Sequence, residues 1–205
     1  MDLIAFFQSG GPFMYAILVV MALGLAIALE RFYFLSKTHG HTKRIWKNLS
    51  PMLQAQDLER AYENVKVLNS PLATVLEYGF VRRKAKAKRD IVDAAMEEGI
   101  MEVTPELEER THYLATLANI ATLLGLLGTI IGLIEAFTAV ASADPAEKAD
   151  LLSASISVAM NTTAFGLTAA IPLILIHSYL ATKTTRLVDN LEMAAVKCLN
   201  LICED

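Results

Sequence analysis

Hydroxyl and amide side chains inside two apolar stretches of the sequence are the residues best suited to do chemistry. Thr129 lies in GLLGTIIGLIEAF, residues 125–137, and Asn161, Thr162 and Thr163 follow one another in a later stretch. Their oxygen atoms can ligate a cation or line a polar path. Because hydroxyl groups in apolar helices also bond to their own backbone, an ion-conducting assembly and a structural membrane scaffold both stay open.

Three glycines accompany Thr129, although each costs about 1 kcal/mol relative to alanine inside a helix. Lipid gives a small residue no advantage, so small residues mark close contact between helices. We therefore expect Gly125, Gly128, Gly132 and, in the later stretch, Gly166 to be packing positions. Counting by three and four gives two stripes of small or hydroxylated residues: Ala115, Ala118, Thr122, Gly125, Thr129, Gly132 and Ala136 in the first, and Ser155, Ala159, Thr162, Gly166 and Ala170 in the second.

The remaining polar residues form no catalytic or metal-binding pattern. The four histidines are scattered, and the sequence has no Ser/His/Asp grouping, phosphate-binding loop or metal-ligand spacing. Cys198 and Cys203 are interpreted as packing residues. The basic run from Arg82 to Arg89 lacks interleaved aromatic residues and is interpreted as a solvated helix face or a lipid-headgroup contact, without nucleic acid as a partner. The sequence thus indicates a protein that is not an enzyme.

Three long uncharged runs are the elements that must position these residues. They cover residues 12–29, 113–134 and 151–182, and each reaches the length of about 20 residues that a helix needs to cross a hydrocarbon core about 30 Å thick. The chain of 205 residues is 54% hydrophobic, with a mean hydropathy of +0.42. These features predict an all-α polytopic membrane protein with three transmembrane helices rather than a soluble helical bundle.

The distribution of Lys and Arg predicts the orientation of the chain. These residues gather between the first and second runs and in the C-terminal tail, and basic segments stay on the cytoplasmic side of a membrane. The predicted segments are a periplasmic N-terminus at 1–11, transmembrane helices at 12–35, 113–137 and 151–182, a periplasmic loop at 138–150, a cytoplasmic helical segment at 36–112 and a cytoplasmic C-terminal helix at 183–205.

Long helices are expected to extend from the membrane into a cytoplasmic helical bundle. Ser50-Pro51 and Ser70-Pro71 are typical of helix starts, with a cap residue before proline. A helix from Asp90 is expected to enter the second transmembrane run without a loop, disturbed near Gly99 or Pro105. The third run is expected to continue as the C-terminal helix, whose apolar face comprises Leu187, Leu191, Ala194, Ala195 and Cys198.

Two motifs resemble those of the MotA/TolQ/ExbB proton channel family, in its ExbB/TolQ branch. G-L-L-G-T-x-x-G, at residues 125–132, is similar to the signature of the second transmembrane helix, and T-A-x-G-L-x-x-A-I-P, at residues 163–172, is similar to that of the third. The motifs are weak singly and specific as a pair, because their order and their separation by a short outer loop also match. The resemblance covers the whole chain.

This resemblance implies a subunit of a pentameric motor stator in the bacterial inner membrane. Five subunits would surround the transmembrane helices of two copies of a partner resembling ExbD, TolR or MotB, and the partner would supply an ionisable aspartate. Thr129 and Thr163 correspond to the pore threonines of the family, with Thr162 and Asn161 beside them in the ion pathway. The resemblance implies no cofactor. The transported ion would be H⁺, with Na⁺ as the alternative, and a non-conducting scaffold that only organises partner helices remains the alternative function.

Three positions depart from the family pattern or allow two interpretations. Val158 stands where ExbB and TolQ proteins have a glutamate, so a proton relay through that acid does not carry over. Glu135 lies about one turn inside the outer end of the second run, and is either a snorkelling carboxylate or a pore-mouth acid that attracts cations. His177 is either a proton exit group or an interfacial hydrogen-bonding residue. The motifs do not indicate whether the motor serves import across the outer membrane, envelope maintenance or motility.

Overall fold

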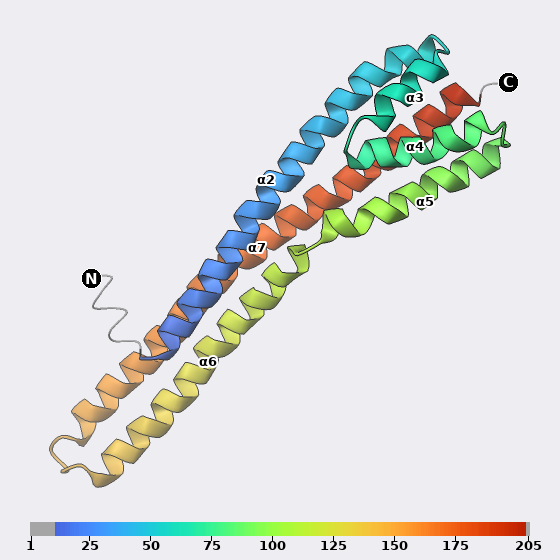
Figure 1. Ribbon diagram of the computed structural model, residues 1–205. Helices are drawn as coiled ribbons and strands as arrows, with labels where there is room; N and C mark the ends of the chain where they lie inside the picture. The colour runs from blue at the N-terminus through green and yellow to red at the C-terminus, as the bar shows by residue number, and fades with distance from the viewer. Residues whose placement is uncertain (1–10, 204–205) are drawn as a thin grey trace. The chain divides into compact units, whose positions relative to one another are not determined.

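The structure is a computed structural model that describes residues 11–203, and within them the chain is built of α-helices without a β-strand. Most of the predicted N-terminal segment, residues 1–10, lies outside the described residues, as do residues 204–205. The all-α fold is therefore confirmed for the described part of the chain. The helices are α2 (Phe13–Gln54), α3 (Leu58–Lys66), α4 (Pro71–Lys84), α5 (Arg89–Glu108), α6 (Thr111–Ser142) and α7 (Lys148–Ile202) (Figure 1).

Three helical stretches are long and apolar enough to cross a membrane: Phe13–Gln54, Arg89–Ser142 and Lys148–Ile202. They contain the three uncharged runs of the sequence except for Pro12, so the prediction of three helices able to span a bilayer is confirmed by length and composition.

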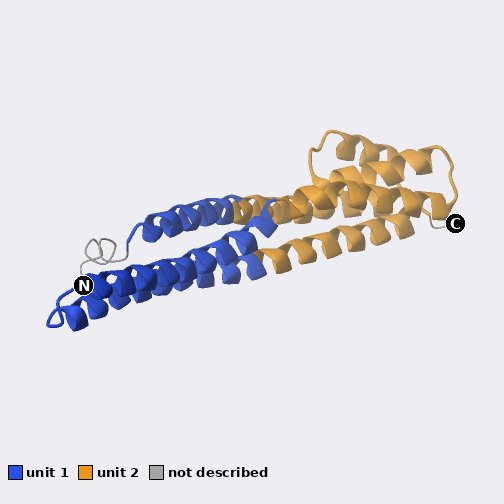
Figure 2. Ribbon diagram, turned by 90° about the horizontal axis from the view of Figure 1, so that it is seen from below, with its two compact units in different colours: residues 1–30, 110–179 blue, residues 31–109, 180–205 orange. Residues whose placement is uncertain are grey.

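The described chain forms two compact units, coloured separately in Figure 2. Unit 1 contains the start of α2, all of α6 and α7 as far as Tyr179, and therefore most of the length of the apolar runs. Unit 2 contains the rest of α2, the helices α3 to α5 and the end of α7 from Leu180. Each unit combines segments that are far apart in the sequence. The division falls a few residues from each cytoplasmic border predicted for the transmembrane helices.

The second transmembrane helix does not continue unbroken from α5, contrary to expectation. Gly99 and Pro105 both lie inside α5. The break follows at Arg110, whose φ of 63° is left-handed, and it comes one turn after the proline, where the Glu109 N–H still donates to the Pro105 carbonyl at 2.9 Å. A left-handed residue cannot continue a right-handed helix, so α6 starts anew at Thr111.

The two predicted Ser-Pro helix starts have opposite outcomes. Ser70 caps α4, because its side-chain oxygen accepts a hydrogen bond from the Ala73 N–H at 3.3 Å and Pro71 occupies the first turn. The prediction for Ser50-Pro51 is wrong, since Pro51 lies inside α2, which ends only at Gln54. Pro51 sits in the last turn of that helix, where the missing N–H removes one hydrogen bond without ending the helix at once.

Unit 2 has an apolar core to which the end of α7 contributes one face. The face predicted from the sequence is confirmed, and its residues are all buried: Leu187, Leu191, Ala194, Ala195 and Cys198. In the same unit, a Cβ atom on Gly99 of α5 would lie 2.9 Å from the Val75 Cα of α4. The two helices approach closely because Gly99 has no side chain.

Candidate functional site

The helices α6 and α7 come into backbone contact in unit 1 at a pair of glycines. A Cβ atom on Gly166 would lie 2.8 Å from the Ala121 carbonyl oxygen and 3.0 Å from the Gly125 Cα, and one on Gly125 would lie 3.3 Å from the Gly166 Cα. Contacts below 3.0 Å require the backbone to move, so only glycine fits at Gly166 in this arrangement. The helices of this seam therefore approach as small-residue helix pairs in membranes do.

The other two glycines of the motif face α7 along the same seam. A Cβ atom on Gly128 would overlap the Thr162 methyl carbon, and one on Gly132 would lie 3.0 Å from the Ala159 Cβ. Gly128 therefore makes room for a β-branched side chain, whereas Gly132 makes room for an alanine.

Thr129 and Thr163 meet beside this glycine contact. The Thr163 hydroxyl donates to the Gly125 carbonyl oxygen across the two helices at 2.8 Å. The Thr129 hydroxyl donates to the same carbonyl within α6 at 3.1 Å, and the two hydroxyl groups contact each other. Both side chains are half-buried. Three oxygen atoms from two helices are thus gathered at one point, which we call the threonine pair site.

The other two residues of the predicted ion pathway, Thr162 and Asn161, and the separately considered Glu135 and His177 lie elsewhere. Thr162 is 2% exposed and its hydroxyl donates to the Val158 carbonyl oxygen of its own helix at 3.0 Å. Asn161 is half-buried, Glu135 is exposed on α6, and His177 is half-buried near the end of the unit 1 part of α7. The structure thus brings Thr129 and Thr163 together and places these four residues at other positions on the helices.

The seam between α6 and α7 follows a register slightly different from the stripe expected on α6. Thr122 is exposed and its hydroxyl donates to the Ala118 carbonyl oxygen at 3.1 Å, whereas Ala121 and Gly128 are buried. Steps of three and four residues from Gly125 lead equally well to Ala121 and Gly128 as to Thr122 and Thr129. The sequence signal for Ala121 was therefore present but did not single it out.

The borders of the two units carry charged pairs. Arg110 and Glu30 form an ion pair at 3.8 Å in unit 1. In unit 2, Arg31 is 3% exposed, donates to the Glu106 carbonyl oxygen at 3.2 Å and pairs with Glu109 at 3.3 Å. A buried guanidinium needs such partners, because an unpaired buried charge is costly.

Comparison with known proteins identifies the family of the chain. The model of the MotA/TolQ/ExbB proton channel family matches residues 67–193, which include both glycine motifs. A putative biopolymer transport protein ExbB homolog of Methanothermobacter thermautotrophicus is 28% identical over 189 residues, which cover 91% of this chain.

Two further relatives match shorter stretches. The Tol-Pal system protein TolQ of Haemophilus influenzae is 37% identical over 75 residues, or 37% of this chain, and the biopolymer transport protein exbB1 of Vibrio cholerae is 41% identical over 73 residues, or 32% of this chain. The matched parts span 66% of the Methanothermobacter protein and 32% of each of the other two. Since the family model matches more than half of its residues, the chain belongs to the MotA/TolQ/ExbB proton channel family.

Proposed function

We propose that this chain is the ion-channel and stator subunit of an ExbB/TolQ-like motor in the inner membrane. The motor would convert the proton motive force, or alternatively a sodium gradient, into mechanical work through an ExbD/TolR-like partner with one transmembrane helix. The subunit would assemble as a homopentamer around two partner helices. Family membership and three helices able to span a bilayer support this proposal.

The observation that carries the proposal is the threonine pair site. Thr129 and Thr163 are far apart in the sequence, yet their hydroxyl groups and the Gly125 carbonyl oxygen converge from two helices. Both hydroxyl groups are half-buried rather than sealed in the seam. Oxygen ligands at such a point suit a cation that moves past the helix pair, or a proton that is passed between hydroxyl groups.

The sequence of the predicted transmembrane helices explains why a partner is needed. Ionisable residues such as Glu30 and Glu135 occur near the ends of these helices, and their middle parts contain none. Threonine hydroxyl groups do not take up and release a proton near neutral pH as a carboxylate does. An acid from another chain must therefore complete a proton path. An aspartate in a partner helix would supply it.

A second candidate function is a non-conducting scaffold that only organises partner helices. The observation that favours it is the bonding of Thr129 and Thr162 to carbonyl oxygens of their own helices, as expected for hydroxyl groups that serve packing alone. In that case the hydrogen bonds of the threonine pair site would only hold α6 and α7 together.

Ion flux into liposomes distinguishes the two functions. The protein is reconstituted alone and together with a candidate single-span partner that carries an aspartate in its transmembrane helix, and flux is recorded separately under a proton gradient and a sodium gradient. A stator subunit gives partner-dependent flux with one of the two ions, which identifies the coupling ion. A scaffold binds the partner in a pull-down and gives no flux with either ion, and that result would contradict the proposal.

A further inference from the structure

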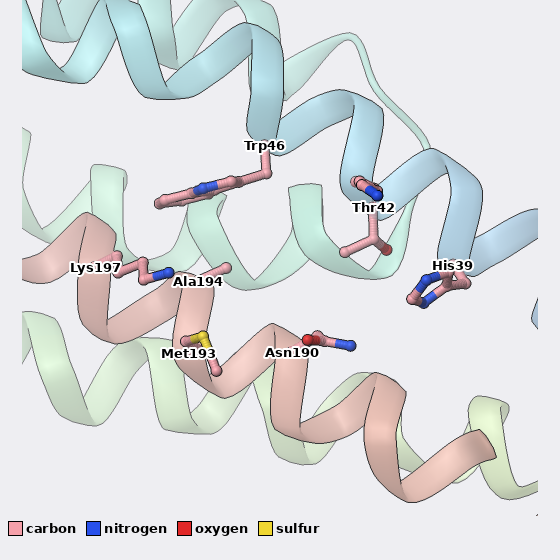
Figure 3. A pocket seen from close by; sticks show the side chains of 8 residues that line it. His39, Thr42, Trp46, Asn190, Met193, Ala194 and Lys197 are labelled. Carbon is pink, nitrogen blue, oxygen red and sulfur yellow. The ribbon is translucent and has the colours of Figure 1, made fainter.

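A groove between α2 and α7 in unit 2 is lined by residues that have no part in the proposed ion path. Its volume is about 320 Å³, and Thr42 and Trp46 of α2 line it opposite Asn190 and Lys197 of α7. Figure 3 shows the indole of Trp46 extending from α2 and the side chain of Lys197 extending from α7 into the space between the two helices. The groove is separate from the threonine pair site, which belongs to unit 1.

Thr42 is the first sign that the groove binds a ligand. Its side chain is 6% exposed, and within the part of the chain that the structure describes its hydroxyl group has no hydrogen-bond partner. An unsatisfied buried hydroxyl group destabilises the folded protein, and Thr42 does not bond to its own helix as Thr129 and Thr162 do. The hydroxyl oxygen has less than 1 Å² of accessible surface at the wall of the groove, so a rotation about the Cα–Cβ bond would turn this unused donor towards an acceptor there.

The charge of the groove indicates an anionic ligand. Lys43 and Lys197 line it together with His39, and among the described residues that line it none is acidic. Two ammonium groups and a hydroxyl donor suit the oxygen atoms of a phosphate group.

The remaining lining residues suit the organic part of such a ligand. Trp46 offers a large aromatic face, and Met193 offers a flexible thioether on the opposite helix. Aromatic rings and methionine give apolar contact area to ligands of varied shape. We propose that the groove binds an organic phosphate, with its phosphate group at Thr42, Lys43 and Lys197 and its apolar part against Trp46. The phosphate can belong to a soluble metabolite or to the headgroup of an anionic lipid.

The fluorescence of Trp46 provides the test, because it is the single tryptophan of the chain. The purified full chain in a maltoside detergent is titrated with inorganic phosphate, with adenosine monophosphate and, separately, with phosphatidylglycerol. We expect a saturable change in the Trp46 spectrum with one of the two organic phosphates and weaker binding of inorganic phosphate. Adenosine monophosphate as the better ligand identifies a soluble source, and phosphatidylglycerol identifies a lipid source.

Matched variants separate a built site from general charge attraction. The double variant Lys43→Gln/Lys197→Gln should weaken binding at least about tenfold, which corresponds to the loss of about 1.4 kcal/mol, and Thr42→Val should weaken it by a smaller factor. The control Lys37→Gln/Lys66→Gln removes the same charge from exposed positions outside the lining set and should bind as the wild type does. Circular dichroism verifies that each variant is folded.

Three results would overturn this proposal. The first is the lack of a saturable change with any of the three probes. The second is equal binding by the Lys43→Gln/Lys197→Gln variant and its control. The third is a Trp46 spectrum that shifts with protein concentration and not with phosphate, since the groove would then be occupied by a second copy of the chain. None of these results depends on ion flux, so the proposed motor function is tested separately.

Discussion

At the scale of single residues, the two threonines of the pair site are not equivalent. Thr129 bonds within its own helix, whereas Thr163 reaches across from α7 to the Gly125 carbonyl oxygen of α6. Hydrogen bonds between transmembrane helices contribute about 0.6 kcal/mol on average. These two hydroxyl groups are therefore expected to add little to the stability of the helix pair. A role in ion transfer predicts a far larger effect on flux than on stability.

Replacing Thr129 or Thr163 with valine should abolish or strongly reduce partner-dependent flux in liposomes. Valine keeps the branched shape and removes the oxygen, so the subunit should still assemble and bind its partner, with a stability loss of about 1 kcal/mol or less. The matched control is Thr168→Val, since Thr168 is exposed on the same helix and bonds to the Ala164 carbonyl oxygen of its own turn. Wild-type flux in both pair-site variants would leave the motif with a packing role only.

Cys198 should react with thiol reagents far more slowly than an exposed cysteine. Burial, with a further contribution from the charge of Cys203, raises the pKa of Cys198 from its ordinary value of 9.0 to about 12. The unfolded thiol ionises above pH 9 and the folded one does not, so the free energy of unfolding should fall as pH rises from 9 towards 12.

Alkylation of the Cys203→Ala variant isolates Cys198 and measures this difference. Labelling at pH 8 should be slow in the folded protein and fast after denaturation. Rapid labelling of the folded variant at pH 8 would show that the thiol is not enclosed.

At the scale of helices, close approach at glycine decides how α6 and α7 pack. The Ala121 carbonyl oxygen and the Gly125 Cα leave no space for a side chain at Gly166. By contrast, Gly40 in α2 has nothing within 4 Å of the position of an added Cβ. Packing thus requires glycine at Gly166, as it does at Gly99, and does not require it at Gly40.

Gly166→Ala should destabilise the protein by about 1–3 kcal/mol, because the added methyl group forces the two helices apart. The matched variant Gly40→Ala should stabilise it by about 0.5–1 kcal/mol through better helix propensity. Equilibrium unfolding in mixed detergent micelles measures both changes. A loss of stability in Gly40→Ala as large as in Gly166→Ala would show that the seam is placed wrongly.

The sequence predicts those helical features that depend on local chemistry. The cap at Ser70 follows from a side chain that bonds its own helix start, and the apolar face of the C-terminal helix follows from its spacing. Pro51 has the same local pattern as Pro71 but lies inside α2, since neighbouring turns outweigh one lost hydrogen bond. The left-handed Arg110 has no local signal, because the residue is neither glycine nor asparagine.

The candidate site was predictable in its residues but not in its pairing. Spacing by three and four places Thr129 among the small residues of α6, yet it does not say which partner Thr129 meets. The packing of α6 against α7 selects Thr163, directs Thr162 towards Gly128 and leaves Thr122 exposed. These outcomes depend on the relative rotation of two helices, which one sequence does not fix.

At the scale of the whole molecule, many large apolar side chains of unit 1 remain exposed. Leu126 and Ile130 of α6 and Leu175 of α7 are each about half exposed or more, at 54%, 49% and 65%. Lipid can cover such residues, and so can neighbouring copies. Polar residues of α7 such as Ser153 and Ser157 are exposed in the same unit, and lipid tails offer them no hydrogen-bond partner.

The detergent-solubilised protein should therefore be a homo-oligomer, with a pentamer expected from its family. Native mass spectrometry gives the number of subunits directly. Leu126→Ile, on the exposed side of α6, should leave that number unchanged, since it keeps the volume and apolar character of the side chain. A stable monomer under these conditions would contradict the proposed assembly.

The division of the chain into units also determines the order in which the protein can be completed during synthesis. Unit 2 takes residues 31–109, which precede α6, and a helix segment from Leu180 onward, which follows the second and third apolar runs. Leu187, Leu191 and Cys198 of that segment are buried. Ribosomes make chains from the N-terminus. The core formed by the helices α3 to α5 therefore stays incomplete until both later apolar runs and the end of α7 have been synthesised. A nascent chain that stalls before Leu180 would therefore present an apolar surface to chaperones and proteases.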